Sequence, residues 1–217
     1  MIWTILYILG AYLVGAVPFG YLAGKCNGID LREHGSCNIG ATNAWRVLGK
    51  QWGLPVFIMD FLKGFLPVLG AMTWMPDWCG VEGWMADLGV VLTCFAVVLG
   101  HTYTCFLGFK GGKGVATTAG VLFALNWVVA CWALGAWLVL MLATGIVSLG
   151  SIIAAVAMIV SGWFNYELFA ADGSVCSQVL YIGFFSLIGL LVIVKHRSNI
   201  VRLIQGTEPS FYSKKSK

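Results

Sequence analysis

The stretch GVATTAGVLFALNWVVACWALGAWLVLMLATGIVSLGSIIAAVAMIVSGWFNY, residues 114–166, decides the fold class, because it contains no Asp, Glu, Lys or Arg. As a single helix rising 1.5 Å per residue it would be about 80 Å long, whereas the core of a bilayer is about 30 Å thick. Its length therefore favours three short membrane helices, with breaks near 126–130 and 145–151. A single crossing is the alternative.

The composition of the whole chain also indicates a membrane protein. Of the 217 residues, 10% are charged and 59% are hydrophobic, whereas about 25% of the residues in ordinary soluble domains are charged. A soluble protein of this size could not cover its surface with so few charges. We therefore expect an all-α integral membrane protein, and the composition excludes disordered chains, coiled coils and secreted scaffolds.

Four further apolar stretches are long enough to cross a bilayer. They cover residues 1–24, 52–75, 88–103 and 173–194. With three helices in the neutral stretch we expect seven transmembrane helices, and with a single crossing there we expect five. We treat 1–217 as one membrane-embedded domain, with a helical core over 1–205 and a tail over 209–217.

The basic residues fall in alternate connections between these spans. Those connections carry Lys25, Arg32, Arg46, Lys50, Lys110, Lys113, Lys195, Arg197, Arg202, Lys214, Lys215 and Lys217. The other connections carry Asp77, Glu82, Asp87, Glu167 and Asp172 and no Lys or Arg. Cytoplasmic connections are enriched in Lys and Arg, so the N-terminus is predicted outside and the C-terminus inside, with short helical or re-entrant cytoplasmic loops.

The first basic connection reads LREHGSCNIGATNAWR at 31–46 and is rich in glycine and hydrogen-bonding side chains. Exposed amides at a glycine-rich turn before a helix form a natural anion site. Ser36, Thr42 and Asn43 can donate to phosphate oxygens, and Arg46 adds a fork of donors. The alternative is a re-entrant turn whose polar groups bind only one another.

The second basic connection reads GFKGGKGVATT at 108–118 and resembles a phosphate-binding loop. It is not a Walker A motif, because the G-x4-G spacing is missing and Gly114 stands where a Ser or Thr would hold magnesium. A marker of membrane topology explains its two lysines but not the four glycines around them. We therefore favour a site for a phosphomonoester or an acyl phosphate at this helix start.

The third basic segment reads KHRSNIVRLIQGTE at 195–208. His196, Asn199 and Arg202 can share one helical face through i, i+3 spacing. Taken alone, this segment is more typical of a lipid-headgroup anchor.

Other polar residues carry weaker signals. Asp60 and Lys63, at i, i+3 within a span, are interpreted as a structural pair beneath the site, and His101 as either a helix-end or a site residue. None of the seven cysteines has a metal-binding or thioredoxin spacing, and whether Cys79 and Cys176 pair is open. We expect no metal, organic cofactor or nucleic-acid partner. The H-x4-D motif of thioester-using glycerolipid acyltransferases is absent.

Four motifs together resemble the PlsY family of acyl-phosphate-dependent glycerol-3-phosphate acyltransferases. They are GSCNIGATNxxR at 35–46, GH at 100–101, FKGGKGVAT at 109–117 and KHRxNIxRLxxGTE at 195–208. The resemblance implies a seven-helix enzyme of the bacterial inner membrane with its site facing the cytoplasm. It implies transfer of a fatty acyl group from acyl phosphate to the 1-hydroxyl of glycerol 3-phosphate. The products would be lysophosphatidic acid and phosphate, in the first acylation step of phospholipid synthesis.

The resemblance also assigns roles to residues. The catalytic set is Ser36, Arg46, Lys113 and His196, and the substrate-binding set is Asn38, Thr42, Asn43, Lys110, Gly111, Gly112, Gly114 and Asn199. Because acyl phosphate is an activated mixed anhydride, direct attack by the glycerol hydroxyl needs no acyl-enzyme. Either His196 or a substrate phosphate oxygen accepts the proton, and we favour the phosphate.

The chain departs from the family pattern at two positions. Cys37 stands where the family usually has glycine, and we expect it not to be a nucleophile. The proline usual after His101 is missing.

Two other functions remain as alternatives. One is a transporter of a phosphorylated metabolite, and the other is a scaffold that binds anionic membrane lipids.

Overall fold

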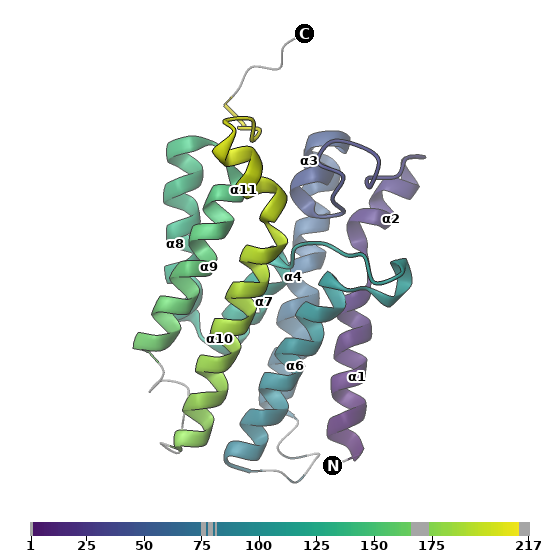
Figure 1. Ribbon diagram of the computed structural model, residues 1–217. Helices are drawn as coiled ribbons and strands as arrows, with labels where there is room; N and C mark the ends of the chain where they lie inside the picture. The colour runs from purple at the N-terminus through teal and green to yellow at the C-terminus, as the bar shows by residue number, and fades with distance from the viewer. Residues whose placement is uncertain (1, 75–76, 78–79, 81, 166–173, 213–217) are drawn as a thin grey trace.

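The computed structural model describes residues 2–74, 77, 80, 82–165 and 174–212, and the regular elements within these ranges are all helical. They are α1 (Ile2–Ala16), α2 (Phe19–Cys26), α3 (Ala41–Leu48), α4 (Lys50–Thr73), α6 (Trp84–Thr102), the 3-10 turn η1 (Cys105–Leu107), α7 (Val115–Leu125), α8 (Trp127–Thr144), α9 (Val147–Phe164), α10 (Val175–Lys195) and α11 (Arg197–Ile204). They form one bundle, with the N-terminus at its lower end and α11 at its upper end (Figure 1). The predicted all-α architecture is confirmed.

Among the described residues, six helical segments are long and apolar enough to cross a membrane. They are 2–26, 50–73, 84–107, 127–144, 147–164 and 175–195. α7 is apolar but has only 11 residues, or about 16 Å of helix, which is too short to cross alone. The loop before it runs below α3 and α11 (Figure 1), so α7 begins inside the bundle. The seventh crossing therefore stays a prediction.

The neutral stretch divides into three helices at the two predicted breaks. At the first, Asn126 caps α8, because its side-chain oxygen accepts hydrogen bonds from the amides of Val128 and Val129. At the second, Gly145 ends α8 with a φ of 68°, a left-handed conformation that glycine adopts without strain. Local sequence chemistry therefore sets both boundaries.

The sequence predicted one apolar span over residues 1–24. In the structure this span is interrupted at Pro18, which separates α1 from α2. Proline has no N–H group and cannot continue the ladder of helical hydrogen bonds. The carbonyls of Ala16 and Val17 accept instead from the Thr104 hydroxyl at 2.6 Å and the Lys63 ammonium at 2.8 Å. Two side chains that are distant in the sequence, one on α4 and one just after α6, thus satisfy backbone groups that lipid could not.

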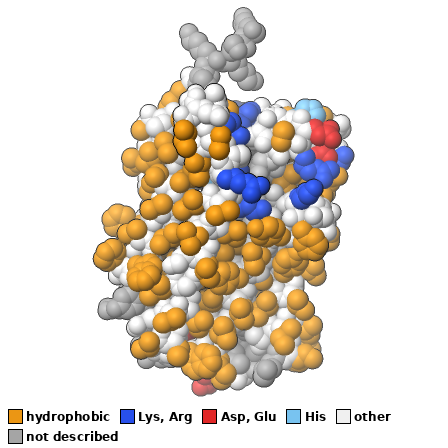
Figure 2. Space-filling view, in the orientation of Figure 1, with side chains coloured by type: hydrophobic (Ala, Val, Ile, Leu, Met, Phe, Trp, Pro, Cys, Tyr) orange, Lys and Arg blue, Asp and Glu red, His pale blue; other side chains and the backbone are white. Residues whose placement is uncertain are grey.

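The bundle is closely packed inside and apolar outside. The backbones of α4 and α7 touch where they cross, since a Cβ on Gly64 or Gly120 would overlap a carbonyl oxygen of the other helix. Large hydrophobic side chains cover the outer surface, while Lys and Arg gather toward the upper end (Figure 2). The structure is that of an integral membrane protein whose Lys and Arg side chains gather toward one end.

Candidate active site

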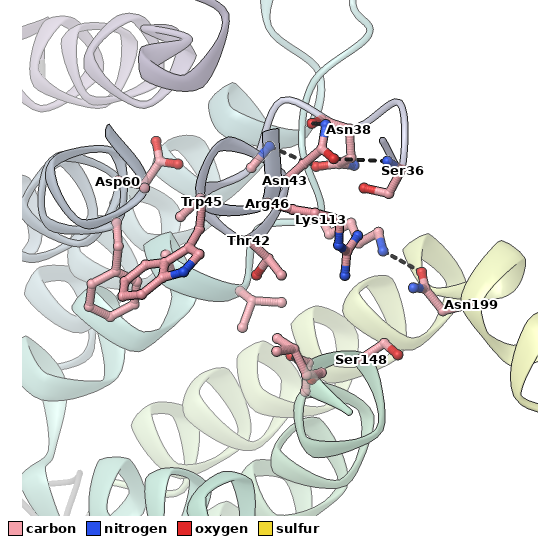
Figure 3. Close-up of a pocket in the computed structure, with 18 of the residues that line it drawn as sticks. Ser36, Asn38, Thr42, Asn43, Trp45, Arg46, Asp60, Lys113, Ser148 and Asn199 are labelled. Atoms are coloured by element: carbon pink, nitrogen blue, oxygen red, sulfur yellow. Dashed lines mark hydrogen bonds between the residues drawn. The ribbon is translucent and has the colours of Figure 1, made fainter. Parts of the chain in front are cut away.

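A cavity of about 610 Å³ lies between the helix pair α3–α4 and the helix pair α8–α9. Its polar wall contains Ser36, Asn38, Thr42, Asn43, Arg46, Lys113, Gly114, His196 and Asn199. These residues come from all three basic segments of the sequence, which are far apart along the chain (Figure 3). Folding therefore brings most of the predicted site residues together in one cavity.

Three helices begin at this cavity. The first residues of α3 (Ala41 and Thr42), of α7 (Val115) and of α9 (Val147 and Ser148) are all part of its lining. A helix N-terminus presents unpaired amide groups and a partial positive charge, which favour anions. Together with the side chains of Arg46 and Lys113, the N-termini of α3 and α7 suit the polar end of the cavity to phosphate, whereas Ser148 at the start of α9 donates to the carboxylate of Glu208.

The first motif folds around the side chain of Asn43, which is only 2% exposed. Its amide nitrogen donates to the carbonyls of Leu31, His34 and Asn38 at 3.2, 3.0 and 2.8 Å, and its oxygen accepts from the backbone amide of Ser36 at 2.8 Å. Asn43 borders the cavity, but its hydrogen-bonding groups serve the loop. It shapes the segment that presents Ser36 to the cavity (Figure 3).

Lys113 belongs to a network centred on Glu208, a residue to which the sequence had assigned no role. The Lys113 ammonium donates to the side-chain oxygen of Asn199, whose amide nitrogen donates to Glu208 at 2.6 Å. Ser148 and Arg202 each donate to the same carboxylate at 2.7 Å. Because a carboxylate only accepts, Glu208 orients the Asn199 amide so that its oxygen faces Lys113.

The charges of the site are perturbed by burial and by one another. The pKa of Lys113 is lowered to about 8, chiefly by burial; the carboxylate of Glu208 opposes this shift, and the charges of Arg202 and Arg46 contribute to it. Burial alone would raise the pKa of Glu208, but hydrogen bonds from Ser148, Asn199 and Arg202 hold it below its ordinary value. The site therefore holds an ionised carboxylate and a lysine that titrates close to neutral pH.

His196 is buried at the cavity wall, where its Nδ1 lies 2.8 Å from the carbonyl of Val192. A carbonyl only accepts, so Nδ1 carries the hydrogen and Nε2 is left with a free lone pair. Burial, and then the charge of Lys113, lower the pKa of His196 to about 4. The ring is thus neutral at physiological pH.

Three predicted substrate-binding residues do not line the cavity. Lys110 is exposed, and the amides of Gly111 and Gly112 donate to the carbonyls of Thr102 and His101, each at 3.1 Å. Those two amides are thus engaged by α6, and the geometry does not support the predicted phosphate contact through them. Both glycines instead let the loop lie directly against the end of α6, because a Cβ on either would overlap His101.

The apolar walls of the cavity were missed by sequence reasoning. One wall contains Trp45, Leu54 and Phe57, and the facing wall contains Trp137, Met141, Val147, Pro209 and Phe211. Asp60 and His101 also line the cavity, whereas the sequence had placed Asp60 beneath it. Apolar residues in a membrane protein carry no signal that separates a ligand groove from a lipid-facing surface.

The C-terminal segment 209–212, expected as a tail, is part of the cavity wall. The Phe211 amide donates to the carbonyl of Gly145 at 2.9 Å, and the Ser210 hydroxyl donates to the carbonyl of Thr144 at 2.9 Å. The Tyr212 hydroxyl donates to the carbonyl of Leu142 at 3.0 Å. These bonds attach the segment to the last turn of α8 and to Gly145 just after it.

Cys37 is exposed, does not line the cavity and has a φ of 56°. This left-handed conformation is strained for a residue with a side chain, which accounts for the glycine that the family resemblance places here. The geometry agrees with the expectation that Cys37 is not a nucleophile. Of the two cysteines whose pairing was open, Cys176 is exposed and Cys79 lies outside the described residues.

Comparisons with known proteins agree with this site. The glycerol-3-phosphate acyltransferase family profile matches residues 5–206. The glycerol-3-phosphate acyltransferase of Aquifex aeolicus (strain VF5) is 43% identical over 204 residues, covering 94% of this chain and 97% of that protein. That of Geobacter sulfurreducens is 44% identical over 202 residues, covering 93% and 94%.

Solved structures give the same answer. The crystal structure of PlsY (YgiH), an integral membrane glycerol 3-phosphate acyltransferase, in its glycerol 3-phosphate form matches with a TM-score of 0.80 and 40% identity, covering 96% of this chain and 95% of that one. Its lysophosphatidic acid form matches with a TM-score of 0.78 and 39% identity. In sequence and in fold, this chain belongs to the PlsY family of integral membrane glycerol-3-phosphate acyltransferases.

Proposed function

We propose that this chain moves a fatty acyl group from acyl phosphate to the 1-hydroxyl of glycerol 3-phosphate at the cytoplasmic face of the bacterial inner membrane. The products are lysophosphatidic acid and inorganic phosphate. The observation that carries this proposal is the two-part cavity, whose cationic end continues into a groove between two apolar walls. Both substrates carry phosphate, and one of them also carries an acyl chain.

The polar end has enough donors for the phosphates of both substrates. The guanidinium of Arg46 and the ammonium of Lys113 border the same space, close to the helix N-termini at Thr42 and Val115. Ser36 and Asn38 add neutral hydrogen-bonding groups beside Arg46 (Figure 3). Donors fixed in this way stabilise the negative charge that develops on the leaving phosphate and on the carbonyl oxygen under attack.

The apolar walls suit the acyl chain of the donor. Trp45, Leu54 and Phe57 face the groove from α3 and α4, and Trp137 and Met141 face it from α8. Burying each CH₂ of an acyl chain there contributes about 0.8 kcal/mol. The bound acyl chain would thus hold the reactive carbonyl of the donor beside the cationic end, while glycerol 3-phosphate enters from water.

We propose direct transfer, in which the glycerol hydroxyl attacks the acyl carbonyl and the carbon–oxygen bond to phosphate breaks. The proton of the hydroxyl passes to a phosphate oxygen, whose second pKa is about 6. His196, with a pKa of about 4, is a weaker base for this step. Its free Nε2 is suited to accept a hydrogen bond from a substrate hydroxyl and so to orient it.

The orientation in the membrane follows from the position of the charges. The helices α2, α3 and α11, which carry Lys25, Arg46 and Arg202, lie at the upper end of the bundle (Figure 1), toward which Lys and Arg gather in Figure 2. Under the positive-inside rule this end faces the cytoplasm. A transporter of a phosphorylated metabolite is not supported, because the family consists of acyltransferases and, in the described part of the chain, the proposed phosphate-binding groups line one cavity.

The donor is tested by supplying purified protein in detergent with glycerol 3-phosphate and either acyl phosphate or acyl-CoA. Lysophosphatidic acid and released phosphate are measured together. We expect equal amounts of both products with acyl phosphate, and no lysophosphatidic acid with acyl-CoA. Turnover of acyl-CoA at a similar rate would contradict the proposed donor.

A further inference from the structure

Three ionisable side chains lie buried beside the cavity without a part in the proposed chemistry. Asp60, Lys63 and His101 are 2, 4 and 6% exposed, and Asp60 and His101 line the cavity. Burying such groups in a membrane span is costly, so they are usually kept for a function. They belong to α4 and α6, whereas the phosphate-binding cations belong to other segments.

The three side chains form a chain of contacts across the bundle. Lys63 Nζ donates to the carbonyl of Val17, at the break in the first span, and lies 2.8 Å from Asp60 Oδ1. The same carboxylate oxygen lies 3.6 Å from Nδ1 of His101. A freed backbone carbonyl therefore holds Lys63, Lys63 holds Asp60, and Asp60 faces the imidazole of His101.

The other edge of that imidazole supports the loop that carries Lys113. A Cβ on Gly112 would overlap Nε2 of His101 and would lie 2.9 Å from Cε1 and 3.1 Å from Cδ2. The amide of Gly112 also donates to the carbonyl of His101 at 3.1 Å. His101 thus holds the backbone of Gly112 in two ways, through its imidazole ring and through its carbonyl.

We propose that His101 is a positioning residue for Lys113: its imidazole is the seat on which the loop 108–114 rests, and Asp60 and Lys63 fix the orientation of the ring. Since Gly112 immediately precedes Lys113, moving the ring moves the ammonium relative to the phosphate. A displacement of about 1 Å can lower catalytic efficiency by about 10²-fold. This inference rests on the proposed function, and it further assigns Lys113 to the phosphate of glycerol 3-phosphate.

The test is an exchange of side-chain size between positions 101 and 112. We expect His101→Ala to raise KM for glycerol 3-phosphate by about tenfold or more with a smaller change in kcat, because the loop loses its seat. Gly112→Ala alone should be worse, because its methyl group collides with the ring. Adding His101→Ala to Gly112→Ala should restore activity to at least the level of His101→Ala alone, because the methyl group then has room.

The matched control is Gly111→Ala. A Cβ there would overlap the backbone carbonyl of His101, which truncation of the side chain leaves in place. The losses from Gly111→Ala and His101→Ala should therefore multiply. Gel filtration and thermal melting show whether each variant folds. If Gly111→Ala does not fold, a second variant at the tested position, His101→Gln, is measured and checked for folding in the same way. It lacks the ring and should show the same rise in KM.

The outcomes separate this inference from the proposed function. If Lys113→Ala raises KM for glycerol 3-phosphate but His101→Ala and His101→Gln do not, the proposed positioning role of His101 is wrong and the proposed function stands. If the losses of activity from Gly112→Ala and His101→Ala multiply in the double variant, the proposed contact between the ring and Gly112 is wrong. If Lys113→Ala itself leaves KM unchanged, the proposed role of Lys113 fails, and the inference fails with it.

Discussion

The two loops that bring cations to the cavity are held in place in different ways. The loop 31–46, which carries Arg46, is organised from within, because Asn43 bonds to three of its carbonyls and to one of its amides. The loop 108–114, which carries Lys113, is organised from outside by the end of α6. The first loop therefore depends on one side chain, and the second depends on the packing of the spans beneath it.

The largest expected effect is the loss of either cation. Lys113→Ala or Arg46→Ala should lower kcat/KM by roughly 10²- to 10³-fold, the range seen when one fixed donor to a developing charge is removed. Phosphate release at saturating acyl phosphate measures the effect. Near-normal rates in a folded variant would remove that residue from the site.

The next effect breaks the first loop from within. Asn43→Ala removes one hydrogen-bond partner from three carbonyls and one amide, of which the His34 carbonyl keeps a bond from the Cys37 amide. The buried Leu31 carbonyl loses its side-chain donor, and a buried unsatisfied group costs about 1 to 3 kcal/mol. We expect a clear loss of thermal stability together with a loss of activity through misplaced Ser36 and Arg46. The control is Asn27→Ala, which removes one local hydrogen bond to Ala23 and should change stability by about 0.5 kcal/mol or less. Equal losses from the two variants would contradict the central role of Asn43.

The charge on Lys113 predicts a dependence on pH in the second loop. With a pKa of about 8, the ammonium loses its proton above pH 8, so kcat/KM should fall about tenfold per pH unit there. Stability should change in the opposite direction. The lysine pKa is lower in the folded chain than in the unfolded chain, so the unfolded state binds more protons between about pH 8 and pH 10.5, and stability rises with pH in that window.

A charge-preserving substitution sharpens the pH experiment. Lys113→Arg stays protonated throughout this range, so its residual activity should show no decline between pH 8 and pH 10. An unchanged alkaline decline in the variant would assign the titration to another group.

The smallest expected effect relieves strain in the first loop. Cys37→Gly removes a side chain from a residue with φ of 56°, so we expect unchanged kinetics and a gain in stability of up to about 1 kcal/mol. Thermal melting and turnover of the purified variant measure both quantities. An inactive variant would make Cys37 a functional thiol.

How much the sequence could predict depends on the range of the interactions. The breaks at Asn126 and Gly145 were predictable, because a cap and a left-handed glycine act over a few residues. The position of Glu208 at the centre of the Lys113 network was not predictable, because its partner Ser148 is distant in the sequence. The bond from the Gly111 amide to the carbonyl of Thr102 on α6 was likewise not predictable, because it joins two segments through the packing of the spans.

The break in the first span shows an intermediate case. Pro18 signals an interruption by itself, but the continuous apolar run around it predicted one helix. Only the structure shows that Lys63 satisfies the carbonyl of Val17, and hence why a charge is kept in the second span. The pairing of Asp60 with Lys63, by contrast, follows from i, i+3 spacing and is confirmed.

The most direct test of direct transfer from acyl phosphate is a rapid-mixing measurement of phosphate release with and without glycerol 3-phosphate. Because no hydrogen bond among the described residues activates the Ser36 hydroxyl and Cys37 lies outside the cavity, the account predicts no phosphate release until glycerol 3-phosphate is added. Release should then be steady and equal to the lysophosphatidic acid formed. A burst of one phosphate per enzyme without glycerol 3-phosphate, with an acyl group bound to the protein, would contradict it.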